Sequence, residues 1–200
     1  DVFARYVLAI DYDALVIDVF EPANFGYRGD GTSLPVWIEH GETFVTAQLY
    51  ADGRMAPAKL KLDTGSTSFL GLNGSFVDQN NLVAESRARI PATGAALGGL
   101  PEHFVSRLDS LVLGPWTIAR PVAAFSASLA RDGDAGTVGA DLLRRFRCIF
   151  DYSRRRLILE PRPVLKEAVG FDASGLMLIA TGPRLDSLQV LAVTPDSPGA

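Results

Sequence analysis

The sequence predicts a mainly β protein, because alternation of apolar and polar residues is its dominant pattern. The alternation is clearest in residues Tyr6–Phe20, Phe44–Tyr50 and Ala58–Leu62. Successive side chains of a strand point to opposite faces of its sheet, so a period of two indicates strands with one buried face. We therefore expect antiparallel sheets.

Turn residues separate these strands, and few segments are typical of helices. Glycine stands next to aspartate in Arg28–Gly31, Ala51–Arg54 and Arg131–Asp134, which favours tight connections. Residues 75–82 begin with a serine cap followed by an aspartate three positions later, and residues 139–146 place leucine and phenylalanine on one helix face. One or two short helices are expected.

Composition narrows the class of protein. The 200 residues are 48% hydrophobic and 21% charged, which indicates one globular domain with a further fragment and excludes general disorder. A net charge of -4 argues against a nucleic-acid partner. Cys148 is the single cysteine, and His40 and His103 are far apart in sequence, so no disulfide, metal site or cofactor is predicted. The apolar stretches are shorter than the ~20 residues of a membrane-spanning helix.

The start of the chain is similar to a later part of it. Leu8–Pro22 and Cys148–Pro161 each read as a strand, an Asp-Tyr corner, a second strand and Glu-Pro. Asp151 follows Asp11 by 140 positions. The similarity is either that of two unrelated hairpins or a true repeat. In a true repeat, residues 1–22 are the closing hairpin of a preceding lobe; otherwise they are N-terminal interface strands.

The residues that carry chemistry lie at the end of the strand that includes Ala58–Leu62. Asp63-Thr64-Gly65-Ser66 places a carboxylate at a strand end, beside a glycine and two hydroxyls that can bond to it. An ordinary hairpin has a similar composition. The residues alone leave both readings open.

The surrounding pattern resembles the aspartic protease family. Leu62-Asp63-Thr64-Gly65-Ser66 resembles the family's active-site loop, and Val138-Gly139-Ala140-Asp141 resembles the hydrophobic-Gly element that braces this loop. The resemblance implies a retropepsin-like acid protease β-barrel lobe over residues 35–162. It also implies that Asp63 is catalytic, that Thr64 makes contacts across the lobe interface, that Gly65 brings its amide to the carboxylates, and that Ser66 hydrogen-bonds Asp63. The implied flap is the Gly-rich segment with Gly94, Gly98 and Gly99, and a flexible surface loop is the other reading of this segment.

The family hydrolyses peptide bonds with a water held between two aspartates, so the implied partners are a polypeptide substrate and a second Asp-bearing lobe. A second Asp-Thr-Gly or Asp-Ser-Gly is absent from the 200 residues. The other carboxylate would come from a homodimer mate or from a preceding lobe. The offset of 140 places it about 77 residues before Asp1, and the similarity of residues 1–22 to the closing hairpin favours the preceding lobe. A catalytically silent module for peptide binding or assembly is the alternative function.

Residues 170–200 resemble the opening of a PDZ domain. Gly175-Leu176 is similar to the carboxylate-binding loop of that family, and Ser197-Pro198-Gly199-Ala200 to the turn before its helix. The resemblance implies a partial PDZ-like segment; the other reading is a hairpin packed on the main domain. Both resemblances together imply a bacterial periplasmic, cell-envelope or secreted peptidase.

Overall fold

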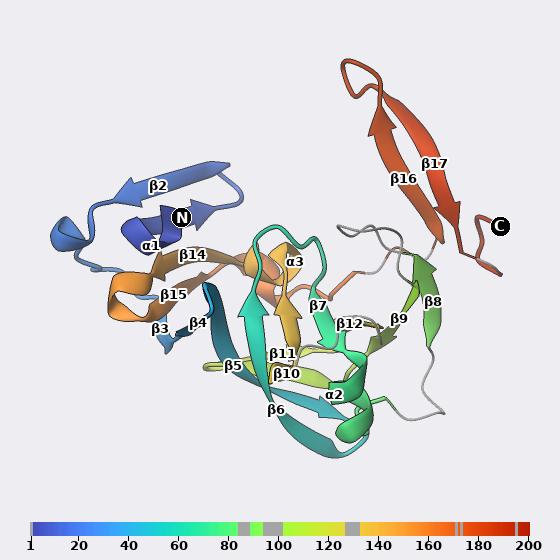
Figure 1. The fold of residues 1–200 in the computed structure, drawn as a ribbon, viewed down its shortest axis with the longest axis horizontal. Coiled ribbons are helices and arrows are strands. Elements are labelled where there is room, and N and C mark those ends of the chain that lie inside the picture. Colours follow the sequence, from blue (N-terminus) through green and yellow to red (C-terminus); the bar gives the residue numbers. More distant parts are fainter. Residues whose placement is uncertain are drawn as a thin grey trace.

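The computed structural model describes residues 2–83, 89–93, 102–126, 133–170, 172, 174–194 and 196–200. Strands dominate these residues (Figure 1), which confirms the mainly β prediction. The predicted segment 75–82 overlaps α2 (Gly74–Gln79), and the predicted segment 139–146 contains α3 (Ala140–Leu143). The predicted serine cap is wrong, because the N-cap of α2 is Asn73 and Ser75 lies inside the helix. A further helix, α1 (Val2–Arg5), escapes prediction because four residues are too few to show a helical period. None of the described helices is long and apolar enough to cross a membrane.

The larger sheet has ten strands and surrounds the main core. Its order is β11-β10-β5-β6-β13-β7-β12-β9-β8, with β4 also paired to β5. The bounds are β4 (Trp37–Glu39), β5 (Glu42–Ala51), β6 (Arg54–Leu62), β7 (Leu70–Asn73), β8 (Ile90–Thr93), β9 (Glu102–Arg107), β10 (Ser110–Leu113), β11 (Trp116–Ala119), β12 (Val122–Ser126) and β13 (Gly136–Val138). The predicted turn between β5 and β6 is confirmed: Asp52 and Gly53 have φ angles of 51° and 73°, as a two-residue hairpin turn requires. Leucines that are fully buried inside this sheet include Leu49, Leu60, Leu70 and Leu111.

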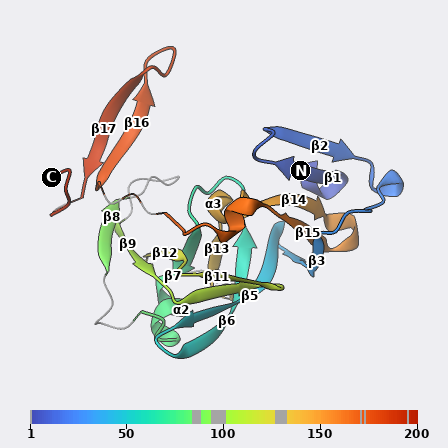
Figure 2. The same cartoon turned by 180° about the vertical axis from the view of Figure 1, so that it is seen from behind.

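A second sheet joins the beginning of the chain to its later part. Its order is β2-β1-β14-β15-β3. The bounds are β1 (Val7–Asp11), β2 (Val16–Phe20), β3 (Thr32–Pro35), β14 (Phe146–Asp151) and β15 (Arg156–Pro161), with short 3-10 helices at Pro22–Asn24, Tyr152–Arg154 and Pro163–Lys166. Figures 1 and 2 show β1 and β2 beside β14 from both sides. Cys148 is buried in β14.

The pairing in this sheet has a local twofold symmetry. All five residue pairs of the β1–β2 hairpin recur in the β14–β15 hairpin at an offset of 140 residues, from Val7↔Phe20 and Arg147↔Glu160 onward. The two hairpins meet through Ala9↔Ile149, and these residues are themselves 140 apart. On either side of this pair, Leu8 pairs with Phe150 and Ile10 pairs with Cys148. Cys148 follows Leu8 by 140 positions and Phe150 follows Ile10 by 140, so the symmetry turns each of these two pairs into the other. The two similar sequences therefore occupy equivalent places about one axis.

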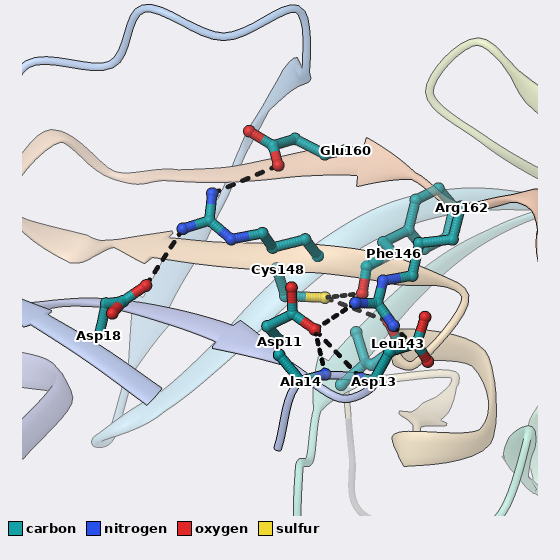
Figure 3. A network of polar contacts seen from close by, with 10 residues as sticks. Asp11, Asp13, Ala14, Asp18, Leu143, Phe146, Cys148, Glu160 and Arg162 are labelled. Carbon is teal, nitrogen blue, oxygen red and sulfur yellow. Dashed lines mark hydrogen bonds and ion pairs between the residues drawn. The ribbon is translucent and has the colours of Figure 1, made fainter. Parts of the chain in front are cut away.

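Arginines fasten the first 25 residues to the rest of the chain. Arg162 forms ion pairs with Asp11 and Asp13, and Figure 3 shows its guanidinium between these carboxylates. Arg147 pairs with Asp18 of β2 and with Glu160 of β15, each at 3.3 Å. A third arginine, Arg154, donates hydrogen bonds to the carbonyls of Pro22 and Phe25. The arginine-rich sequence around β14 therefore serves internal contacts.

The C-terminal residues form a separate two-stranded hairpin. Strands β16 (Leu176–Thr181) and β17 (Ser187–Val193) pair only with each other among the described strands. The hairpin extends away from both sheets in Figures 1 and 2. Large apolar side chains such as Leu178, Leu188 and Val190 are exposed on it. This exposure differs from the predicted alternative of a hairpin packed on the main domain.

A buried carboxylate at the end of β14 generates the first prediction. The side chain of Asp151 is 0% exposed and accepts hydrogen bonds from Ser153, Arg154 and Arg156. Burial raises its pKa, but these hydrogen bonds outweigh burial and hold the pKa below its usual value. Since the pKa is lowered, the stabilisation is complete above the usual carboxyl range and is lost as the pH falls through the lowered pKa.

We predict that Asp151→Asn lowers the free energy of unfolding by about 2 kcal/mol at pH 7. The amide has no negative charge, and its NH2 group replaces one of the two acceptor oxygens that face Arg154 and Arg156. The difference from the wild type should narrow below about pH 4. Urea unfolding at several pH values measures both effects. Asp78→Asn, at an exposed position of α2, is the control. A loss that is the same at pH 3 and pH 7 would contradict the prediction.

Candidate functional site

The candidate site is the loop that connects the end of β6 to the start of β7. We call residues 63–69 the Asp loop. Strand β13 lies between β6 and β7, parallel to the first and antiparallel to the second. The Asp loop therefore passes over the end of β13, and Asp63 lies where β6 and β13 both end.

Backbone hydrogen bonds hold the Asp loop to β13 and to the residues that follow it. The amide of Asp63 donates to the carbonyl of Val138 at 3.0 Å, and the amide of Ala140 donates to the carbonyl of Ser66 at 2.7 Å. The amide of Gly139 donates to the carbonyl of Phe69 at 3.4 Å. The structure thus brings the predicted bracing residues, Val138 and Gly139, against the predicted catalytic loop.

Gly139 is required by this close approach. A Cβ atom at this position would lie 2.2 Å from the carbonyl oxygen of Ser68 and 2.8 Å from that of Ser66. Both are backbone atoms, which cannot move aside as a flexible side chain can. The absence of a side chain at Gly139 therefore allows the Asp loop and the bracing segment to touch.

The Asp63 carboxylate is held from one side and open on the other. Its Oδ1 accepts a hydrogen bond from the amide of Gly65 at 3.0 Å, and its side chain is 38% exposed. Thr64 and Gly65 are exposed. The hydroxyl of Ser66 lies 2.9 Å from that of Ser68, whereas the sequence led us to expect it on Asp63. The amide of Gly65 supplies the local hydrogen bond to the carboxylate instead.

A pocket of about 240 Å³ opens beside Asp63. Its charged lining groups among the described residues are Glu42, Lys61 and Asp63. The ammonium of Lys61 lies 3.8 Å from Asp63 Oδ2 and 3.5 Å from Glu42 Oε1. Phe3 and Tyr152 also line this pocket, and their rings stack at a centroid distance of 5.7 Å. The pocket therefore joins the Asp loop to the helix α1 at the start of the chain.

A larger hollow of about 420 Å³ lies beside β1 and β14 and contains no residue of the Asp loop. Two of its charged groups, Arg147 and Glu160, are already paired with each other, and Arg147 also pairs with Asp18. Tyr27 donates a hydrogen bond to Glu160 at 2.9 Å. Because the larger hollow contains no residue of the Asp loop, we place the candidate site at the smaller pocket. The described residues include no group of three or more side chains suited to hold a metal ion.

Two further predicted sites are the flap and the carboxylate-binding loop. The flap residues expected from the sequence, Gly94, Gly98 and Gly99, lie outside the described residues. Gly175 has a φ of +75°, which glycine adopts easily. Its carbonyl accepts a hydrogen bond from the amide of Thr194 at 2.8 Å, and Leu176 begins β16. The role of Gly175 and Leu176 in carboxylate binding stays a prediction.

Sequence reasoning missed two charged residues of the pocket, Lys61 and Glu42. The alternation in β6 could have found Lys61, because residues two apart in a strand share a face. Glu42 could not be found in this way. Its proximity depends on the register of β5 and β6, in which Phe44 pairs with Lys61.

Comparison with known proteins gives matches at the level of structure. No family model matches the chain, and no curated protein matches it. A retropepsin-like aspartic protease from Rickettsia conorii is 18% identical, with a TM-score of 0.47 over 68% of this chain and 95% of that chain. Basic 7S globulin from soybean is 14% identical (TM-score 0.41, 84% of this chain) and edgp is 11% identical (TM-score 0.41, 87% of this chain). The chain spans 54% and 57% of the lengths of these last two proteins.

The contact at Gly139 generates the second prediction. Gly139→Ala should lower the free energy of unfolding by about 2–3 kcal/mol, because the added methyl group meets backbone atoms that cannot retreat without moving the Asp loop. Chemical denaturation measures the loss. Gly26→Ala is the matched control, since a Cβ atom there meets nothing within 4 Å. Equal stability of the two variants would show that the Asp loop does not need the close approach.

Proposed function

We propose that the chain contributes one lobe of an aspartic endopeptidase, with Asp63 as one of two catalytic carboxylates. The observation that carries the proposal is the bracing of the Asp loop by Val138, Gly139 and Ala140. This bracing fixes the backbone of a carboxylate that remains partly exposed at the rim of a pocket. A positioned, accessible carboxylate is what general acid-base catalysis requires.

The proposed chemistry needs a second carboxylate close to Asp63. Two carboxylates in contact do not both ionise readily, so the pair shares one proton, and the aspartic protease dyad is the standard example of this effect. The ionised carboxylate takes a proton from a water molecule as the water oxygen bonds to the peptide carbon. The protonated carboxylate donates its proton to the carbonyl oxygen. The carboxyl group that took the proton from water then gives it to the peptide nitrogen, while the other carboxylate takes a proton from one hydroxyl of the tetrahedral carbon. The C–N bond breaks, and the two fragments leave as an amine and a carboxylic acid.

The twofold register of the five-stranded sheet supports a preceding lobe as the source of this carboxylate. A local twofold axis at the pair Ala9↔Ile149 relates the β1–β2 hairpin to the β14–β15 hairpin. The second hairpin closes the lobe that contains Asp63. By the same symmetry, the first hairpin closes a similar lobe whose Asp loop faces Asp63 across the axis.

The outer edge of β2 supports the same conclusion. Strand β15 pairs with β3 at its outer edge, and the described residues include no strand at the equivalent edge of β2. The apolar side chains of Val16, Ile17 and Val19 are exposed there. An exposed apolar edge strand invites pairing with another chain segment. In the proposed assembly, a β3-like strand of the preceding lobe covers it.

Two tyrosines at equivalent positions of the two hairpins differ in the polar surroundings of their hydroxyl groups. A preceding lobe would explain this difference. The side chain of Thr43 interacts with that of Tyr152 and lowers its pKa, although burial has the larger effect and raises it. Tyr12 occupies the equivalent position in the first hairpin, and its hydroxyl is buried without a hydrogen-bond partner in the described part of the chain. Burial raises the pKa of Tyr12 to about 12. In the proposed assembly, a residue of the preceding lobe that corresponds to Thr43 supplies the partner.

We extend the proposal to the C-terminal hairpin as the first part of a PDZ-like module that captures peptides. Leu178, Leu188 and Val190 leave apolar surface exposed on β16 and β17. A hairpin of two strands is marginally stable by itself. Additional strands and a helix packed on this surface would complete such a module.

The test of the proposed function is the substitution Asp63→Asn. It should abolish peptide cleavage by the complete protein while leaving the unfolding transition unchanged, because the amide keeps the size of the side chain but cannot act as a base. Cleavage of an unstructured protein between pH 3 and pH 7 measures the activity. Asp78→Asn, at an exposed position of α2, is the control and should cleave normally.

Two outcomes decide between the candidate functions. Full cleavage by Asp63→Asn would remove Asp63 from the reaction. A wild-type protein that binds unfolded polypeptide without cutting it would support the alternative of a silent peptide-binding module.

A further inference from the structure

We infer that Arg145 is a positioning residue that couples the Asp loop to residues 163–169, which we call the strap. The strap lies between the lobe and the partial PDZ-like segment expected over residues 170–200. The coupling means that the Asp loop is fully ordered only while the strap is docked on Arg145. Its consequence for catalysis rests on the proposed function, whereas the coupling itself is a property of the lobe.

Arg145 is a buried residue, and its guanidinium donates to main-chain carbonyls in the described part of the chain. It follows α3, its amide donates to the carbonyl of Leu142 at 3.1 Å, and only 4% of the residue is exposed. Its Nε is buried without a hydrogen-bond partner in the same part of the chain. A buried charge is costly unless polar groups compensate it. The groups that do contact the guanidinium therefore decide what this residue contributes.

Three carbonyls of the strap accept hydrogen bonds from the Arg145 guanidinium. Nη1 donates to the carbonyls of Val164 and Glu167, each at 2.8 Å, and Nη2 donates to that of Ala168 at 3.5 Å. The amide of Arg162 donates in return to the carbonyl of Arg145 at 3.0 Å. The planar fork of an arginine presents several donors at once in a fixed geometry. One side chain therefore fixes the strap at three main-chain atoms.

The same guanidinium lies over the last residue of the Asp loop. Its central carbon is 5.4 Å from the centre of the Phe69 ring, which is within the range of a cation–π contact. Phe69 is buried, and its carbonyl accepts the hydrogen bond from the Gly139 amide that braces the loop. An apolar side chain in place of Arg145 could pack on this ring but could not hold the carbonyls of the strap. Arg145 therefore links the loop to the strap.

The far end of the strap is anchored by other groups. Val169 is buried in the main core, and its carbonyl accepts a hydrogen bond from Arg107 at 3.0 Å. Leu165 packs against the same core. The strap is the covalent connection from β15 to the C-terminal hairpin, so a ligand or domain that displaces the strap would also remove the partners of Arg145. Binding at the hairpin and order of the Asp loop are thereby linked, and such a linkage acts in both directions.

Amide hydrogen exchange of the full chain, followed by NMR, tests the coupling. The reporters are hydrogen-bonded amides of the Asp loop and of the strap, namely Asp63, Ser66, Leu165 and Glu167. In Arg145→Met, exchange should become about tenfold faster in both segments, because the strap loses its donors and Phe69 loses its cation.

The neighbouring arginine provides the matched control. The side chain of Arg144 is 60% exposed and pairs with Asp141. Arg144→Met removes the same charge next to the same helix without touching the strap carbonyls. It should leave exchange in both segments unchanged.

A variant of the strap tests the coupling from the other side and serves also if Arg145→Met does not fold. Val169→Ala removes apolar contacts at the far end of the strap. It should make exchange of the Asp63 and Ser66 amides about threefold faster, although Val169 is not part of the loop. Val77→Ala, at a valine of α2 that is also buried in the main core, is the control for a general loss of packing. It should not speed up exchange in the loop more than in β5.

Cleavage by the complete protein gives a further readout. Arg145→Met should lower kcat about tenfold and change KM by less than about twofold, because a misplaced catalytic group slows the reaction without weakening substrate binding. A purely structural role would lower the amount of folded protein and leave the kcat of the folded fraction unchanged.

Three exchange results in Arg145→Met would overturn the inference: unchanged exchange in both segments, faster exchange in the strap alone, or equally faster exchange in every strand. Cleavage that survives Asp63→Asn would instead overturn the proposed function and leave the exchange result standing. The two claims therefore fail by different measurements.

Discussion

The candidate site depends on the hydrogen bonds between the Asp loop and the residues at the end of β13. A loop that carries an exposed carboxylate would sample many conformations if only its two ends were fixed. Here the amides of Asp63, Gly139 and Ala140 each bond to a carbonyl across the contact. Gly139 makes the contact possible because it has no Cβ atom to separate the two backbones. The carboxylate is thereby positioned by main-chain atoms and leaves its outer oxygen for other groups.

The second sheet gives this local arrangement its larger context. It unites a hairpin from the start of the chain with the hairpin that closes the lobe, and their registers agree over every pair of β1 and β2. Arginines 147, 154 and 162 fasten the two parts through carboxylates and carbonyls. A framework with a twofold axis can place two equivalent carboxylates opposite each other, as the proposed reaction needs. The symmetry of the sheet and the single Asp loop are therefore the two observations behind our proposal of a second lobe.

Much of the fold could be predicted from the sequence because its signals are local. Alternation located β5 and β6, the Asp-Gly pair located the turn between them, and the leucines of α3 located that helix. The placement of β13 between β6 and β7 could not be derived from periodicity. A strand of three residues shows no pattern, and its neighbours are distant in sequence. Resemblance to a known family supplied only the expectation that Val138 and Gly139 brace the Asp loop.

The same limit applies to the site. Asp63, Thr64 and Gly65 are contiguous, so a motif reveals them. The contact between Lys61 and Glu42 depends on the pairing of two strands, and the stacking of Phe3 on Tyr152 depends on how distant segments assemble. Ser66 also differs from its expected role, since its hydroxyl lies against Ser68. Hydroxyl rotamers and long-range pairs are set by tertiary packing, which a single sequence does not display.

The most direct test of the central claim is the mass of the 200-residue chain in solution, measured by light scattering on the same sample that is assayed for cleavage of an unstructured protein. Our account predicts a monomer that does not cut, because its single Asp loop lacks the opposing carboxylate. Addition of a preceding lobe with its own Asp loop should produce cleavage. A dimer of the 200-residue chain that cuts would contradict this account, because two copies of Asp63 would then form the pair without a second kind of lobe.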